Sequence, residues 1–143
     1  MKRTLLFVLI LSVVKLSFSQ VTSPGSPPIT DTSSKIFEKV DMEASFPGGE
    51  DSWRKFLVKN ILKITSQALR TKIPSAIYSV TVKFIVEKDG SITIYETVSN
   101  PKNIYLEEKC SGMIQKSPKW QPAMQNHKIV KAFRLQPLTI VMD

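Results

Sequence analysis

Residues 78–86 alternate between apolar and polar side chains, which is the period of a β-strand with one buried face. One face would carry Tyr78, Val80, Val82, Phe84 and Val86, and the other Ser79, Thr81, Lys83 and Ile85. Residues 91–98 continue the pattern, with Ile92, Ile94 and Val98 expected on a common face. An Asp-Gly pair at residues 89–90 favours a tight turn between the two segments, so the sequence predicts a β-hairpin.

A helical period follows a turn earlier in the chain. Residues 46–49 (Phe-Pro-Gly-Gly) predict a tight turn, because Pro fixes one φ and Gly adopts positive φ readily. Apolar residues then recur at helical spacing: Trp53, Phe56, Leu57 and Ile61. Two acidic residues precede them, where the helix dipole favours negative charge. We therefore expect a helix over residues 50–62 and a second short helical piece near residues 66–71.

A second helix is predicted from Asn103, which can cap its first turn. Its apolar stripe consists of Leu106, Cys110, Met113 and Ile114, and it should end before Pro118. Cys110 on this stripe is expected to be a small core residue. Trp120 is likewise expected in the core, and residues 36–42 are expected to form a short strand.

Residues 129–141 predict a long final strand after a turn at residues 125–128. The apolar positions change from odd to even numbers along it, as the positions of Phe133, Leu135, Leu138 and Ile140 show. An inserted residue at 136–137 would restore a common face, so we expect a β-bulge there. Pro137 has no N–H to donate, which is tolerated mainly at a sheet edge, so this strand is predicted to lie at an edge.

The N-terminal residues resemble a secretory signal, with Lys2 and Arg3, a short apolar run at residues 5–14, and small residues before Gln20. We predict a signal peptide over residues 1–19, and residues 20–35, rich in Ser, Thr and Pro, as a flexible tether. The protein is therefore expected to be exported, without a stable membrane anchor. The alternative is an uncleaved anchor over residues 5–18.

Composition narrows the chemistry of the chain. It has 143 residues, 20 Lys and Arg against 12 Asp and Glu, one Cys and one His, with a formal net charge of +8. Removal of residues 1–19 takes away three positive charges and leaves +5. One Cys excludes an internal disulfide and a Cys-rich zinc site, and one His excludes a multi-His metal centre. We expect no cofactor and no metal, and dispersed cations without interleaved aromatics do not favour nucleic acid.

No catalytic constellation is evident in the sequence. His127 lies in a predicted turn, and Cys110 is expected to be buried away from it. Glu107 and Glu108 are adjacent, so on a helix they point about 100° apart and cannot face each other. The Gly pair at residues 48–49 could bind an anion before a helix, although a tight turn explains it as well. The sequence therefore predicts a protein that is not an enzyme.

Three segments together resemble the TonB C-terminal domains of Bacteroidetes-type envelopes. They are Phe-Pro-Gly-Gly at residues 46–49, the hairpin at residues 80–92, and the closing segment at residues 117–123 (Ser-Pro-Lys-Trp-Gln-Pro-Ala) with residues 137–140 (Pro-Leu-Thr-Ile). Because these segments occur in the same order as in the family, the resemblance extends over roughly residues 36–141. The resemblance implies an α+β fold in which two helices pack on a small antiparallel sheet, forming one domain over residues 36–143.

The resemblance also implies a location and a function. The exported protein is expected in the periplasm, or, if the N-terminal anchor is retained, in the inner membrane facing the periplasm. Family members bind an extended receptor segment, the TonB box of an outer-membrane receptor, by adding it as a strand to a sheet edge. Carried over, the receiving edge comprises Val130, Lys131, Ala132, Phe133, Arg134, Leu135 and Gln136. An open edge also permits a homodimer by strand exchange.

Three alternatives stay open. Cations and Pro137 on the last strand are also devices that prevent edges from pairing, so the edge could be merely protected. The chain could be a membrane-anchored energy transducer of the same family. Such transducers have a membrane helix with a functional His and a long Pro-rich linker, whereas the apolar N-terminal segment of this chain contains no His and its tether is short. It could instead be a structural or polymer-binding envelope protein whose positive charge attracts anionic glycans or lipid head groups.

Overall fold

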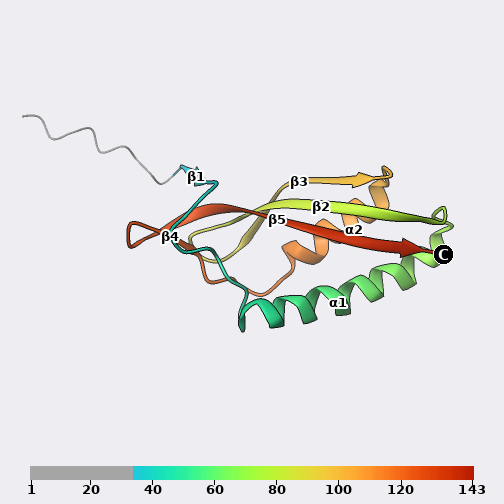
Figure 1. Cartoon of the computed structure of the whole chain (residues 1–143), viewed down its shortest axis with the longest axis horizontal. Helices are drawn as coiled ribbons and strands as arrows, with labels where there is room; N and C mark the ends of the chain where they lie inside the picture. The colour runs from blue at the N-terminus through green and yellow to red at the C-terminus, as the bar shows by residue number, and fades with distance from the viewer. Residues whose placement is uncertain (1–33) are drawn as a thin grey trace, which may run out of the picture. The chain divides into compact units, whose positions relative to one another are not determined.

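A computed structural model describes residues 34–143, so the predicted signal peptide and most of the tether lie outside the described residues (Figure 1). In this part of the chain, two helices and five strands follow one another: β1 (Ile36–Phe37), α1 (Gly49–Ala68), β2 (Ala76–Val86), β3 (Ile92–Asn100), α2 (Ile104–Gln115), β4 (Ala123–Gln125) and β5 (Lys128–Met142). This arrangement confirms the α+β fold. Within residues 34–143, no helix is both long and apolar enough to span a membrane.

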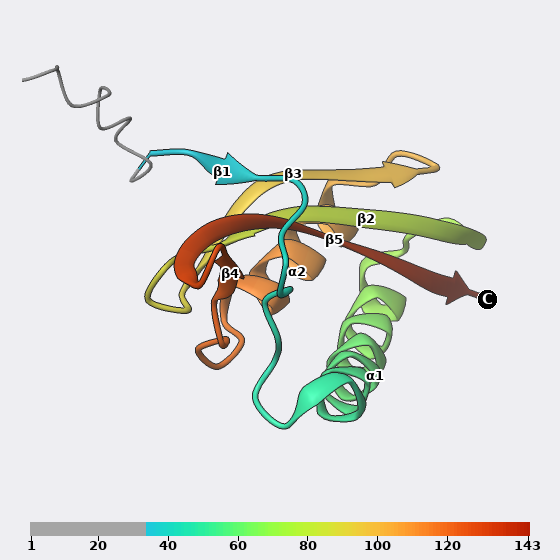
Figure 2. The ribbon, with the colours of Figure 1, turned by 60° about the vertical axis from the view of Figure 1, so that its left-hand side comes forward.

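The sheet has the order β1-β5-β2-β3, and β4 pairs separately with the beginning of β5. Strand β2 is antiparallel to both β3 and β5, whereas the short β1 runs parallel to β5, so the sheet is mixed. Both helices lie on the same side of the sheet (Figure 2). The opposite face carries no helix in the described part of the chain, and we name it the open face.

The core lies between the helices and the sheet. All five apolar side chains predicted on the inner face of β2 are buried, which confirms the alternation. An aromatic cluster closes one end of the core, with ring centroids of Trp53 and Trp120 4.9 Å apart and those of Phe84 and Trp120 5.6 Å apart. Trp120 is thus a core residue, as predicted.

Helix α1 is longer than predicted. The expected helix and the short piece after it form one continuous helix, Gly49–Ala68, extended by a 3₁₀ turn over Leu69–Thr71. The predicted turn precedes it, because the N–H of Gly49 donates a 2.8 Å bond to the carbonyl of Phe46. The 3₁₀ turn ends at Lys72, which has φ 54°. Nothing in the sequence between residues 62 and 66 breaks the helix, so the predicted gap was wrong.

The hairpin forms as predicted, but one extra residue in β3 changes the side of the sheet to which its later side chains point. Lys83 of β2 pairs with Glu96, whereas the next residue, Phe84, pairs with Ile94, so Tyr95 is an extra residue in β3. Beyond this β-bulge the side chains of β3 exchange faces. Val98 therefore lies on the open face, 47% exposed, and its predicted place beside Ile92 was wrong.

The bulge predicted in the last strand is absent. Strand β5 pairs with β2 in one uninterrupted register from Ala132 to Met142. Its even-numbered side chains consequently face the helices throughout, and Phe133 and Leu135 lie on the open face. Phe133 is accommodated there by an edge-to-face contact with Tyr95, 5.0 Å between ring centroids. The change of parity in the sequence reflects an apolar patch on the open face and not an inserted residue.

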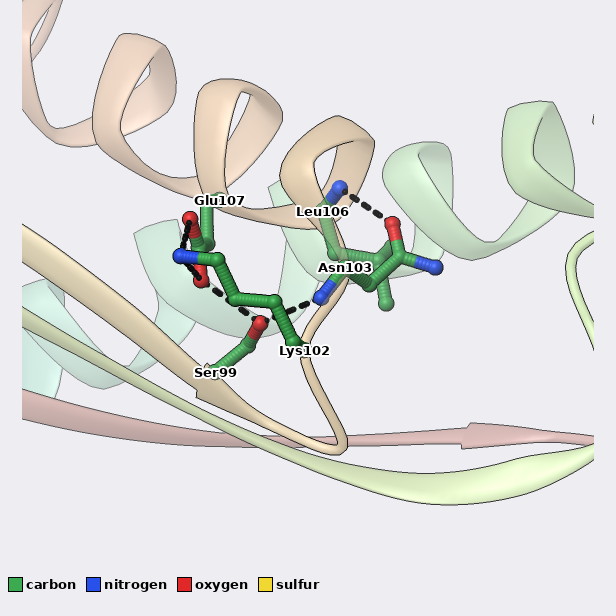
Figure 3. A network of polar contacts seen from close by, with 5 residues as sticks. All are labelled: Ser99, Lys102, Asn103, Leu106 and Glu107. Atoms are coloured by element: carbon green, nitrogen blue, oxygen red, sulfur yellow. Dashed lines mark hydrogen bonds and ion pairs between the residues drawn. The ribbon is translucent and has the colours of Figure 1, made fainter.

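Helix α2 follows the prediction closely. The side chain of Asn103 accepts a hydrogen bond from the N–H of Leu106 (Figure 3). The four predicted stripe residues are buried. The short strand expected over residues 36–42 is only partly formed. Regular pairing is limited to β1, and Met42 makes an isolated bridge with Met124 of β4.

Candidate peptide-binding edge

Strand β5 has 15 residues, and its two flanks are differently occupied. Strand β2 runs along one flank from Ala132 to Met142. On the other flank, strand β1 has only two residues, which pair with Lys131 and Ala132. We name residues 133–142 of β5, with the flank that faces away from β2, the open edge. Within residues 34–143, no strand pairs with this flank.

Three of the seven residues predicted to bind a partner lie before the open edge. Val130 is buried and pairs with Ala123 of β4. Lys131 pairs with Ile36 of β1, and its Nζ lies 2.8 Å from a carboxylate oxygen of Glu87. Ala132 is held between β1 and β2. The main chain at Lys131 and Ala132 therefore already has a neighbour where a guest strand would be added.

The other four predicted residues, Phe133, Arg134, Leu135 and Gln136, lie in the open edge, each paired with β2 alone among the described residues. The regular register continues to Met142, so ten residues extend over about 33 Å at the usual rise of a strand. Pro137 removes one N–H donor from this row. The open edge thus offers a long, regular main chain with one donor missing.

Two inward side chains hold this part of β5 to the rest of the core. The guanidinium of Arg134 donates a 2.6 Å hydrogen bond to the carbonyl oxygen of Ala44 and lies 5.4 Å from the ring centroid of Trp120. The side-chain oxygen of Gln136 accepts a 2.8 Å hydrogen bond from Nε1 of Trp53 in α1. The edge is therefore fixed in place by a backbone carbonyl of the loop before α1 and by the side chain of Trp53 in α1.

The outward side chains form a mixed apolar and charged surface. Nζ of Lys83 lies 4.2 Å from the ring centroid of Phe133 and 3.3 Å from a carboxylate oxygen of Glu38. Leu135, next along the strand, is 63% exposed. An open hollow in this region is lined by Glu38, Glu43, Lys83, Phe133, Arg134 and Leu135. A guest strand beside β5 would place alternate side chains near this hollow.

Three contacts of this region were not predicted from the sequence. The apolar pair Ile36 and Phe37 was recognised as strand-like, but nothing indicated that it would pair with β5. The bond between Trp53 and Gln136 joins residues 83 positions apart, and no local pattern signals it. The position of Lys83 against Phe133 depends on the register of β2 and β5, which the predicted bulge had shifted.

The residues considered for catalysis do not come together. Cys110 is fully buried, and burial raises the pKa of its thiol to about 12. His127 lies in the turn between β4 and β5, exposed and with φ 61°. Glu107 is buried and paired with Lys102, whereas Glu108 is exposed. Among residues 34–143, no three acidic, His or Cys side chains are grouped as metal ligands would be.

No protein-family model, no curated protein and no solved structure matches the chain.

Proposed function

We propose that this protein is a non-catalytic, exported binding module of TonB C-terminal type, which takes up an extended peptide by strand addition at the open edge. The partner would be a segment of an outer-membrane receptor or of another envelope protein. The observation that carries the proposal is the ten-residue stretch of β5 that has β2 as its only strand neighbour within residues 34–143.

The second exposed edge of the sheet is a poorer template. Strand β3 also ends the sheet, but the extra residue Tyr95 interrupts its ladder. A bulge twists an edge and disturbs the spacing of its donors and acceptors, which discourages another strand from pairing. The open edge of β5 has an uninterrupted register. A guest strand therefore has more consecutive main-chain partners on β5.

Recognition of the guest peptide would combine main-chain hydrogen bonds with side-chain contacts. Main-chain hydrogen bonds to β5 would supply affinity, and side chains of the guest would supply specificity. Guest side chains on the open face would meet Phe133, Leu135 and the Lys83 ammonium. An apolar residue two positions from an acidic residue in the guest would match this surface, because alternate side chains of a strand share a face. Since β1 already pairs at Lys131 and Ala132, the guest would begin after these residues or replace β1 there.

The proposal is tested by titrating the isotope-labelled protein with synthetic receptor-derived peptides and following backbone amides by NMR. We expect the largest shifts at residues 133–142 and smaller shifts in β2. A peptide of the same sequence with alternate amides N-methylated keeps the side chains but cannot donate from those positions. It should bind at least tenfold more weakly, because strand addition depends on main-chain hydrogen bonds. Shifts confined to residues 46–51 or to β3 would refute the assignment of the edge.

The anchored alternative is distinguished by the N-terminus of the protein recovered from the cell envelope. A mass that corresponds to a chain starting at Gln20 supports an exported module, whereas retention of residues 1–19 supports a membrane-anchored transducer. Substitution of Cys110 and His127 without loss of the cellular phenotype would remove the remaining support for an enzyme.

A further inference from the structure

The outward side of α1 carries large apolar side chains that no described part of the chain covers. Val58 is 54% exposed, Leu62 is 63% exposed, and Leu69, just after the helix, is 58% exposed. The helical period of about 100° per residue places all three within an arc of about 40°. They are directed away from the buried face of α1, which contains Trp53, Leu57, Ile64 and Ala68.

Exposed cations surround this apolar stripe. They are Arg54, Lys55, Lys59, Lys63 and Arg70. None of the five has a carboxylate within ion-pair distance in the described structure, where the ion pairs of Lys residues involve positions 83, 102, 119 and 131. The acidic residues of α1 are confined to its first turn, at Glu50 and Asp51. The stripe and its cations therefore form a surface of one sign, which we name the α1 surface.

The α1 surface has the side-chain pattern of helices that lie in a membrane interface. Such helices place aliphatic side chains between Lys and Arg residues, whose long stems let the charges reach the head groups. From Val58 to Leu69 the stripe extends about 17 Å, at 1.5 Å per residue. A helix side is convex, so it can settle on a flat, deformable bilayer. An acidic protein partner would have to supply a matching groove.

We propose that the α1 surface binds peripherally to a bilayer that contains anionic phospholipids, with the aliphatic stripe of α1 entering the head-group region. The charge of the surface argues for anionic lipids, because each Lys or Arg near an anionic membrane contributes favourable electrostatic energy. This site lies on the helix and not on the sheet edge. The proposal is therefore independent of peptide binding at β5.

Co-sedimentation of the full chain with vesicles tests the electrostatic part. Vesicles of phosphatidylglycerol and phosphatidylcholine should bind the protein, and vesicles of phosphatidylcholine alone should bind it much more weakly. The double variant Lys55→Glu/Lys59→Glu should reduce the partition coefficient by about thirtyfold or more, because two favourable charges are lost. The matched control Lys88→Glu/Lys128→Glu changes the net charge equally at exposed positions away from α1 and should retain most of the binding.

The aliphatic part is tested in the same assay. Val58→Gln/Leu62→Gln should weaken binding by about tenfold, because the buried apolar area is lost. Ile77→Gln/Val98→Gln removes two similarly exposed aliphatic side chains from the open face of the sheet, outside the open edge, and should leave binding unchanged. All variants share the apolar residues 5–14, so differences between them report on α1. Equal binding of the α1 variants and their controls would overturn the proposal.

A positional probe gives an independent measurement. An environment-sensitive fluorophore can be attached to Val58→Cys or to Ile77→Cys, because Cys110 is fully buried and remains unlabelled in the folded protein. Anionic vesicles should shift the emission at position 58 to the blue and leave position 77 unchanged. No shift at position 58 would refute membrane binding. If the protein instead bound poly-glutamate and not vesicles, and the α1 substitutions abolished that binding, the result would also refute membrane binding and would indicate an acidic protein partner.

Discussion

The indole nitrogen of Trp53 donates a 2.8 Å hydrogen bond to the side-chain oxygen of Gln136. Trp53 lies on the buried face of α1 and is only 2% exposed. The amide nitrogen of Gln136 also donates to the carbonyl oxygen of Pro137, 2.8 Å away, which orients the side chain. This pair joins the helix directly to the open edge, so it fixes the strand on which peptide binding is proposed.

The substitution Gln136→Leu would leave the buried indole N–H without an acceptor. We expect it to lower the free energy of unfolding by about 1–3 kcal/mol, because an unsatisfied buried donor loses its solvation. Urea unfolding measures the change. Gln136→Glu retains the acceptor for Trp53 but loses the donor to the Pro137 carbonyl oxygen, so it should cost less than the Leu variant only at acidic pH, where the protonated carboxyl can donate there. Equal stability of the Leu variant and the natural protein would show that this bond contributes nothing.

Gly90 ends the hairpin turn between β2 and β3 in close contact with the segment after α2. Its carbonyl accepts a 2.8 Å hydrogen bond from the N–H of Trp120, and its φ is 81°. A Cβ at this position would lie 2.1 Å from the carbonyl oxygen of Trp120. Gly90→Ala should therefore destabilise the fold by more than about 2 kcal/mol, because it combines backbone strain with a steric clash.

Gly112 provides the matched control. It lies within α2, and a Cβ there would meet no atom within 4 Å. Gly112→Ala should raise the free energy of unfolding by about 0.5–1 kcal/mol, since Ala is the better helix former. Thermal unfolding of the two Ala variants should therefore shift in opposite directions. A common direction would contradict the assigned environment of one of the two glycines.

The uninterrupted register of β5 predicts opposite responses for two leucines three positions apart. Leu138 is buried against the helices, whereas Leu135 lies exposed on the open face. Leu138→Ala should cost about 2–5 kcal/mol, because it leaves a cavity in the core. Leu135→Ala should change stability by less than about 0.5 kcal/mol, as exposed substitutions usually do. Similar losses for both variants would indicate that β5 contains the bulge expected from the sequence.

Local patterns of the sequence predicted most of the fold. The alternation around Val82, the cap at Asn103 and the turn before Glu50 were identified because each depends on neighbouring residues. The side of the sheet on which Val98 and Leu135 lie could not be predicted in this way. A single extra residue, Tyr95, reverses one face of β3, and its position is decided by pairing with β2. Apolar residues on an open sheet face also look like core residues in a sequence.

The candidate edge was predicted in part. The final strand and its approximate length followed from the sequence, and four of the seven proposed binding residues lie in the open edge. The pairing of β1 with Lys131 could not be foreseen, because strand partners distant in sequence are chosen by tertiary packing. The exposed α1 surface was also missed, since its Val and Leu residues fit an ordinary helix period.

Glu107 is the buried charged residue at the junction of β3 and α2 (Figure 3). Its carboxylate accepts hydrogen bonds from Nζ of Lys102, at 2.7 and 2.8 Å, and from the hydroxyl of Ser99, at 2.7 Å. The Ser99 oxygen in turn accepts a bond from the N–H of Asn103, which caps α2. Burial alone would raise the pKa of Glu107, but the bonds from Lys102 and Ser99 and the ammonium charge outweigh it, so the pKa is lowered.

A lowered pKa in the folded state means that the ionised carboxylate stabilises the fold above its ordinary pKa and that this stabilisation disappears as the pH falls through the folded value. Glu107→Gln should therefore reduce the free energy of unfolding at pH 7 by about 1 kcal/mol, since Lys102 is largely exposed and its attraction is screened. Below the ordinary pKa of 4.5, the difference from the natural protein should shrink progressively. Urea unfolding at several pH values measures this trend. Glu108→Gln, one residue later on the exposed side, should show no such dependence, and a constant difference for Glu107→Gln would mean that its effect is steric and not electrostatic.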